Sequence, residues 1–171
     1  YYELNRVMRR LRGDEFKVQI KGIDEFHLSH DSVMLEAANT SFQIHFQVSP
    51  DEFAPFYNVA QAISAPVLAT AVNSPLLMGR RLWSETRIAL FERSVDTRSE
   101  LQSGRGLQPR VHFGDRWLRK SILEIFQEDI TQHRSVLAGD LTEDACAVLH
   151  SGKIPQLSAL RLHNGTIYRW N

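Results

Sequence analysis

The sequence predicts an α+β fold: a mainly antiparallel sheet with helices packed on one face. Residues 40–48 alternate strictly between apolar and polar side chains, which is typical of a strand with one buried face. Longer stretches with helical periodicity separate this segment from two more alternating stretches, at residues 15–21 and 86–93. The Asn164-Gly165 pair between two extended runs predicts a β-hairpin.

The N-terminal region begins with a predicted helix over residues 3–12. It has an apolar stripe at i, i+3, i+4 and i+7 and a stop at Gly13. Its arginines form either a solvated face or a nucleic-acid-binding face. The strand over residues 15–21 follows. Residues 22–31 then combine histidines and carboxylates, which are metal-ligand types, but their spacing matches no known ligand motif.

The strand predicted at residues 40–48 has an unusual polar face. Amide and imidazole groups hydrogen-bond or ligate without carrying full charge, so this face is a candidate floor for a polar ligand site. The alternative is a face that only meets solvent. The apolar side chains are Phe42, Ile44, Phe46 and Val48, and the polar ones are Ser41, Gln43, His45 and Gln47.

The next helix is predicted to begin with a capping box of Ser49 and Glu52, with Pro50 at its first position. Ala65-Pro66 is expected to break or kink this helix, and the apolar run at residues 66–72 is expected to be buried. The face expected to lie against the sheet consists of Phe53, Phe56, Tyr57, Ala60 and Ile63.

The part of the chain beyond residue 93 predicts a mobile loop over residues 99–109, which are rich in Ser, Gly, Gln and Pro. A helix is expected from Asp115 to His133, and a short helix over residues 142–149. Cys146, in that short helix, is expected to be a packed thiol rather than a nucleophile.

The composition excludes several classes of protein. The chain has 171 residues, of which 43% are hydrophobic and 23% charged, and its net charge is zero. A chain without net charge has no overall electrostatic attraction to nucleic acid or to membranes. No apolar run approaches the ~20 residues of a membrane span. The single cysteine excludes an internal disulfide framework and fits a reducing, cytoplasmic compartment. We therefore expect neither nucleic acid nor a membrane as a partner.

Four side chains are candidates for a site that binds an anionic substrate. Gln43 and His45 lie on the polar face of one predicted strand, Arg87 lies on another, and Arg98 lies just beyond it. Arginine is suited to holding carboxylate or phosphate through two parallel hydrogen bonds. Taken singly, each arginine also fits a surface or salt-bridge role.

Several short motifs carry a resemblance to a known family. They are the run at residues 42–48, Asn73-Ser74-Pro75, Gly79-Arg80, Arg87 with Phe91-Glu92, and the stretch from His163 to Asn171. In this order and spacing, the chain resembles the bacterial glutamate–cysteine ligase family, and within it the carboxylate–amine ligase branch. The resemblance covers most of the chain and is densest from Asp31 to Arg98.

The resemblance implies a glutamine-synthetase-like catalytic core and an ATP-dependent ligase. ATP phosphorylates the γ-carboxylate of glutamate, an amine such as cysteine attacks the acyl phosphate, and Mg²⁺ neutralises the phosphates. Carried over to this chain, Gln43 and His45 line the nucleotide–metal site as candidate metal ligands. Arg87 and Glu92 belong to the substrate-binding strand, and Arg98 falls near a second catalytic arginine.

The sequence also departs from the family. Gln43 stands where the branch has a histidine, which weakens the expected metal ligation. The carboxylate-rich first strand of the family and its arginine-rich strand after Asn171 are not in this chain. We therefore expect residues 1–171 to be a single partial catalytic domain of a longer protein, inactive in isolation.

One alternative is a non-catalytic nucleotide- or amino-acid-binding module, or a regulatory module, that keeps the same sheet. The amine acceptor, the exact acid and the oligomeric state, including a homo-oligomer, stay open at this point.

Overall fold

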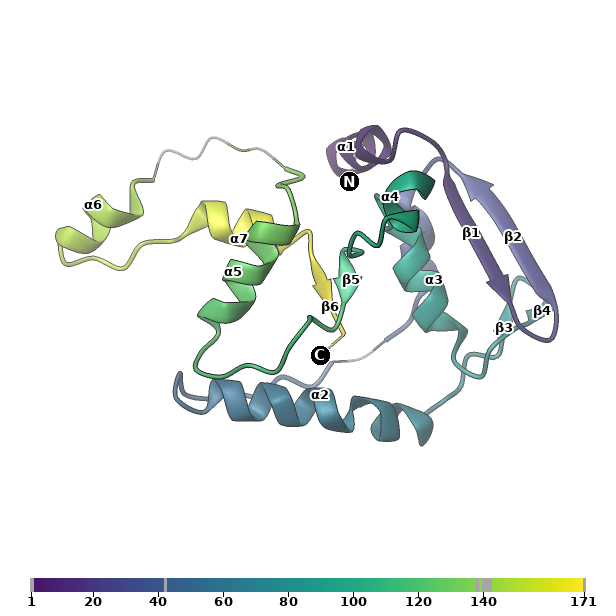
Figure 1. Cartoon of the computed structure of the whole chain (residues 1–171), viewed down its shortest axis with the longest axis horizontal. Coiled ribbons are helices and arrows are strands. Elements are labelled where there is room, and N and C mark those ends of the chain that lie inside the picture. The colour runs from purple at the N-terminus through teal and green to yellow at the C-terminus, as the bar shows by residue number, and fades with distance from the viewer. Residues whose placement is uncertain (1, 42, 138, 140–142, 171) are drawn as a thin grey trace.

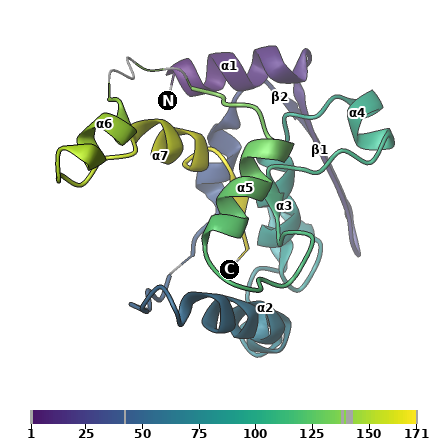
Figure 2. The same ribbon diagram turned by 60° about the vertical axis from the view of Figure 1, so that its left-hand side comes forward.

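The computed structural model describes residues 2–41, 43–137, 139 and 143–170. Its elements are α1 (Tyr2–Arg12), β1 (Phe16–Lys21), β2 (Glu25–His30), the 3₁₀ helix η1 (Val33–Ala38), α2 (Phe53–Ala69), β3 (Leu76–Leu77), β4 (Arg80–Arg81), α3 (Thr86–Ser94), α4 (Glu100–Gly104), β5 (Val111–His112), α5 (Leu123–Gln132), α6 (Ala145–His150), α7 (Ser158–Asn164) and β6 (Tyr168–Arg169). This is a mixed α+β architecture, as predicted. Helices α1 and α2 lie at opposite ends of the molecule, with α3 and α5 between them (Figures 1 and 2).

The described strands form three separate two-stranded sheets. The β1–β2 and β3–β4 pairs are antiparallel, whereas β5 and β6 pair in parallel. Antiparallel pairing thus predominates, but the described residues do not form the single sheet with helices on one face that the sequence predicts. Among these residues, no helix is long and apolar enough to cross a membrane.

The strand predicted at residues 15–21 is confirmed as β1. Phe16, Val18 and Ile20 are buried and alternate with exposed neighbours. The alternation in the sequence therefore predicts correctly which side chains face the core. The segment rich in histidine and carboxylate at residues 22–31 supplies its partner β2, with Ile20 opposite Phe26. The hairpin packs against α3, where Leu90 joins the same core cluster.

The turn of this hairpin fits closely against the loop that precedes α3. A Cβ placed on Gly22 would lie 2.5 Å from Leu82 Cα, so only glycine allows the two backbones to come this close. Trp83 strengthens the contact, because its indole N–H donates to the Lys21 carbonyl at 2.8 Å. This contact fixes the hairpin relative to α3.

The predicted N-terminal helix is confirmed as α1, and it covers a second core cluster. Met8 is 1% exposed and packs with Phe16, Val95 and Val111. The cluster therefore joins α1, β1, β5 and the end of α3. Burial of these apolar side chains is the main source of stability in this part of the fold.

The strand predicted at residues 86–93 is wrong, because this segment is the helix α3. Its buried residues are Thr86, Ala89, Leu90 and Ser94, whose spacings of three and four are helical. The spacing of Ile88 and Leu90 is that of a strand, but Ile88 is only partly buried, and the larger buried set has helical spacing. Arg87 therefore lies in the first turn of a helix instead of within a strand.

The strand predicted at residues 40–48 is not found either. Residues 43–48 have no regular secondary structure, and Ile44 and Phe46 are 69% and 76% exposed. Phe42 lies outside the described residues. A strand needs neighbouring backbone groups to accept and donate its hydrogen bonds. Within the described residues, no backbone hydrogen bond joins 43–48 to another segment, which accounts for its irregular form.

Helix α2 runs through Pro66, so the break that was one of the two predicted outcomes does not occur. A proline removes one backbone hydrogen bond, but the segment stays helical to its end, where the Thr70 N–H donates to the Val67 carbonyl at 3.2 Å. The predicted burial of residues 66–72 is also wrong, because Val67 is 57% exposed. Phe53 and Tyr57 do face the interior, as predicted, whereas the exposed apolar side chains of this helix are Phe56, Val59, Ile63 and Val67.

The hairpin predicted around Asn164-Gly165 is replaced by a helix end. Asn164 is the last residue of α7, and the Gly165 N–H donates to the Arg161 carbonyl at 2.9 Å. Gly165 has φ −64° and ψ −4°, which continues the right-handed helical turn instead of forming the tight hairpin turn that the Asn-Gly pair predicts. The chain after Gly165 then forms β6 and pairs with the distant β5.

Three smaller predictions also need correction. The loop expected at residues 99–109 contains helix α4, which begins with a complete capping box between Ser99 and Gln102. Asp115 does not cap a helix, since α5 begins at Leu123. Cys146 is exposed on α6 and is not a packed thiol. Helix α6 begins after Asp144, which caps it, and Thr142 lies outside the described residues.

Candidate functional site

Arg87 is held by a buried carboxylate at the start of α3. Its Nε donates to Glu85 Oε1 at 2.5 Å, and Glu85 is only 6% exposed. The Ser74 hydroxyl donates to the same carboxylate, and the Asn73 backbone N–H donates to Glu85 Oε2 at 3.4 Å. One carboxylate thus joins the Asn73-Ser74-Pro75 turn to α3. We call Ser74, Glu85 and Arg87 the arginine cluster.

The charges of this cluster stabilise each other. The hydrogen bond from Arg87 lowers the pKa of Glu85, and bonds from Ser74 and Asn73 add to this effect against the opposing effect of burial. The same Glu85 bond raises the pKa of Arg87. Both groups are therefore ionised at neutral pH, and their contact is a charge-assisted hydrogen bond.

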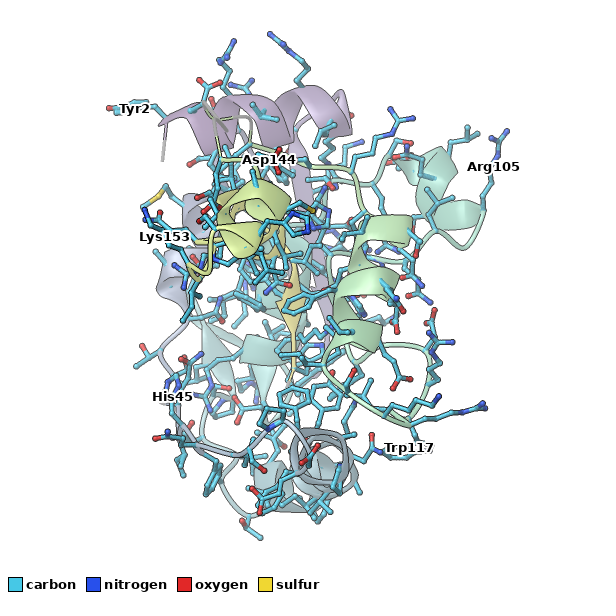
Figure 3. The ribbon with its side chains drawn as sticks, turned by 90° about the vertical axis from the view of Figure 1, so that its left-hand side faces the viewer. Tyr2, His45, Arg105, Trp117, Asp144 and Lys153 are labelled. Atoms are coloured by element: carbon cyan, nitrogen blue, oxygen red, sulfur yellow. The ribbon has the colours of Figure 1, made fainter. Side chains whose placement is uncertain are left out.

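Arg87 also contacts the start of the segment that carries Gln43 and His45. Its NH1 nitrogen donates to the Thr40 carbonyl at 2.5 Å. Gln43 and His45 are both exposed, and Figure 3 shows His45 near the edge of the molecule. The structure thus brings Arg87 to the beginning of residues 40–48 and leaves the two candidate ligands at the surface.

Arg98 and Glu92 lie toward the other end of α3, apart from the arginine cluster. The Arg98 guanidinium donates from Nε and NH2 to the two Asp96 oxygens at 2.9 and 2.8 Å, and from NH1 to the Leu107 carbonyl at 2.8 Å. The hydrogen bond to Asp96 is the main cause of the raised pKa of Arg98, and the nearby charge of Glu92 contributes. With all three nitrogens engaged, Arg98 holds its own loop in place.

The candidate metal ligands do not fit a magnesium site. Mg²⁺ prefers carboxylate oxygens and water in octahedral geometry. No group of three or more His, Cys, Asp or Glu side chains that could hold a metal ion occurs among the described residues. Among the described residues, no hydrogen bond joins Gln43 or His45 to a carboxylate. We therefore assign no step to a metal.

A second polar cluster, which sequence reasoning missed, is buried between β5, α5 and β6. Arg169 NH2 donates to Asp129 Oδ1 at 2.7 Å and lies 3.4 Å from Glu128 Oε1. The imidazoles of His112 and His133 lie beside this pair, with ring centroids 5.3 Å apart. All five side chains are largely buried, and we call them the buried cluster.

The electrostatics of the buried cluster favour neutral histidines. Burial, followed by the neighbouring His112 and Arg110, lowers the pKa of His133 to about 4. Burial also lowers the pKa of His112, with Arg169 as the next cause. Burial alone would lower the pKa of Arg169, but its bond to Asp129 gives a net increase. The arginine therefore stays charged beside two uncharged imidazoles.

The sequence holds no local signal for the buried cluster. Its members come from three separate elements, and their spacing in the chain matches no motif. The available signal was the placement of Glu128 and Asp129 within a predicted amphipathic helix next to inward-facing apolar residues. Adjacent acids on the inner side of a helix require a buried cation, because an unpaired buried charge is costly.

An arginine fixed by a carboxylate next to an exposed polar segment has the chemistry needed to hold a carboxylate or a phosphate. Comparison with known families gives the class of the protein. The sequence profile of glutamate-cysteine ligase family 2 matches residues 6–114, which is more than half of the chain. The chain belongs to the glutamate-cysteine ligase family. No curated protein and no solved structure matches it.

Proposed function

We propose that this chain carries part of the site of an ATP-dependent carboxylate–amine ligase. The observation that carries the proposal is the family match over residues 6–114, which contains the whole arginine cluster and the Gln43–His45 segment. In this reaction an oxygen of the γ-carboxylate of glutamate attacks the γ-phosphorus of ATP, and ADP leaves. The nitrogen of cysteine or another amine then attacks the acyl carbon, and phosphate leaves as the amine loses a proton.

In this proposal Arg87 binds the negatively charged acid. Its Nε and NH1 are engaged by Glu85 and by the Thr40 carbonyl, and the side chain is still 31% exposed. Within the described residues, NH2 has no hydrogen-bond partner and can donate to the oxygens of a substrate carboxylate. Placing a fixed positive charge where negative charge develops is the most effective electrostatic contribution to such a reaction.

Other parts of the proposal follow from the family alone. ATP is the co-substrate and Mg²⁺ the expected metal, with ligands beyond Gln43 and His45, because no group of three or more potential metal-ligating His, Cys, Asp or Glu side chains comes together among the described residues. The glutamine-synthetase-like core, the cytoplasmic location and the treatment of residues 1–171 as one partial domain belong to the same proposal. Glu92 and Arg98 are proposed to stabilise the region around α3, since Arg98 is saturated by Asp96 and Leu107.

The test is an assay of ADP and amide formation by the full-length natural protein with ATP, glutamate, cysteine and a panel of other amines. Ligation predicts ADP release that depends on both acid and amine and falls at least tenfold in Arg87→Ala. Arg105→Ala, which changes an exposed arginine outside the cluster, is the matched control. Acid-independent ADP release, or equal rates in Arg87→Ala and the control, would refute the proposal. The isolated chain is expected to stay at the Arg87→Ala rate.

A second candidate is a non-catalytic module that binds a nucleotide or an amino acid. The exposed positions of Gln43 and His45, without neighbouring carboxylates among the described residues, favour it. Calorimetric titration of the full-length protein with Mg-ATP and glutamate separates the two candidates. Binding without ADP or amide formation supports the module, and product formation excludes it.

A further inference from the structure

We propose that Glu85 is a positioning residue that aims Arg87 and fixes the start of the Gln43–His45 segment. The inference rests on the proposed function and adds a residue to that site. Glu85 lies within the family-matched region but is not one of the residues that the sequence motifs single out. Its carboxylate joins the Asn73–Ser74 turn to the start of α3, and Arg87 extends this connection to Thr40.

The contacts of Glu85 form a closed ring. Glu85 Oε1 accepts hydrogen bonds from the Ser74 hydroxyl and from Arg87 Nε, and Ser74 Oγ in turn lies 3.5 Å from the Arg87 backbone nitrogen. The backbone reinforces this ring, because the Thr86 N–H donates to the Ser74 carbonyl at 3.1 Å. The turn before β3 and the first turn of α3 are thus held in one arrangement.

The ring extends through Arg87 to a third segment. Arg87 donates from Nε to Glu85 and from NH1 to the Thr40 carbonyl, so hydrogen bonds to two separate segments fix its guanidinium plane. Of the five guanidinium N–H groups, these contacts use Nε–H and one N–H of NH1. Both N–H groups of NH2 can therefore donate to the oxygens of a substrate carboxylate.

The cost of burying Glu85 supports a positioning role over a purely stabilising one. Glu85 is 6% exposed, and its charge is kept only because the bonds from Arg87, Ser74 and Asn73 together outweigh the cost of removing the carboxylate from water. A serine hydroxyl and an apolar residue would join the same backbone segments without that cost. A charged acceptor at this point is needed to orient a guanidinium.

The experiment compares Glu85→Gln with wild type in the full-length natural protein, and uses Glu100→Gln, an exposed glutamate on α4, as the control. Glutamine keeps the shape and still accepts from Ser74, but it lacks the charge that holds Arg87. We expect the KM for glutamate to rise at least tenfold, with kcat and the KM for ATP within threefold of wild type. The Arg87 Nε–H resonance, assigned by its loss in Arg87→Lys, should move upfield.

The outcomes separate this inference from the ligase proposal. A resonance that does not move, or a KM for glutamate within twofold of wild type, overturns the role of Glu85. A parallel loss of kcat, of both KM values and of thermal stability also overturns it, because that pattern indicates general unfolding. If wild type releases no ADP, the ligase proposal fails; the resonance then decides alone whether Glu85 positions Arg87.

Discussion

Replacing Arg169 by methionine tests the buried cluster most directly. Arg169 NH2 donates to Asp129 at 2.7 Å and lies 3.4 Å from Glu128, and NH1 lies 3.3 Å from the Tyr57 hydroxyl. Methionine fills a similar volume but leaves two buried carboxylates without a cation. Breaking a buried ion pair on one side costs about 3–5 kcal/mol. With a urea m-value of about 2 kcal/mol/M, the unfolding midpoint should fall by about 2 M.

The measurement is urea unfolding at pH 7 followed by circular dichroism, with Arg161→Met on the exposed face of α7 as the control. A second change sharpens the assignment. Asp129→Asn in the Arg169→Met background removes one stranded charge, so it should recover part of the lost stability instead of adding to the loss. A loss below about 1 kcal/mol at an unchanged m-value, or additive effects in the double variant, would refute the charge-pairing explanation.

The remaining predictions concern separate features. Burial lowers the pKa of His133 to about 4, below its unfolded value near 6.5, so the unfolded state binds more protons and stability falls as the pH drops from 6.5 to 4. The full shift corresponds to about 3 kcal/mol, or about 2 kcal/mol after solvent screening. In urea titrations, His133→Leu should flatten the dependence of the unfolding free energy on pH. A pH dependence equal to that of the control His150→Leu would contradict this prediction. Gly22→Ala should cost about 1–3 kcal/mol through its backbone clash, whereas Gly104→Ala, with open space around it, should not; equal unfolding midpoints would disprove the close contact. Cys146 should react fully with a thiol reagent in the folded protein, and a lag until denaturant is added would show that it is buried.

Local patterns with a partner nearby in the chain could be predicted from the sequence. The strand β1 is correct because Phe16, Val18 and Ile20 alternate and the next segment supplies the pairing strand after a short turn. Helix α1 is correct for the same reason, since its apolar stripe and the stop at Gly13 are both local. In both cases the information needed to form the element lies within a few residues.

Patterns that depend on distant partners were misjudged. Residues 43–48 alternate as a strand does, but no described segment pairs with them, so periodicity alone does not fix their structure. In α3, the short alternation of Ile88 and Leu90 competed with the helical spacing of Thr86, Ala89 and Ser94, and burial against the hairpin decided the outcome.

The candidate site was predicted in part. The sequence named Arg87 for its chemistry, and the structure adds the carboxylate and the turn that hold it. Arg98 was grouped with Arg87 because it lies just beyond the same predicted strand and because arginine is suited to holding carboxylate or phosphate. The structure separates them, because Asp96 lies two residues away and satisfies Arg98 locally. An acid within a few residues of an arginine thus indicates that the arginine can be paired locally and unavailable for a ligand.

The parallel pairing of β5 with β6 has a consequence for how the protein is made. β5 lies at the end of the family-matched region, whereas its partner is formed by Tyr168 and Arg169. The intervening chain takes roughly 3–11 s to synthesise at ~5–20 residues per second. During the later part of that interval, Glu128 and Asp129 are already in the chain while Arg169 has not yet been added. The carboxylates of Glu128 and Asp129 must therefore stay hydrated until β6 has been translated. They can be buried only after β6 pairs with β5 and Arg169 is in place.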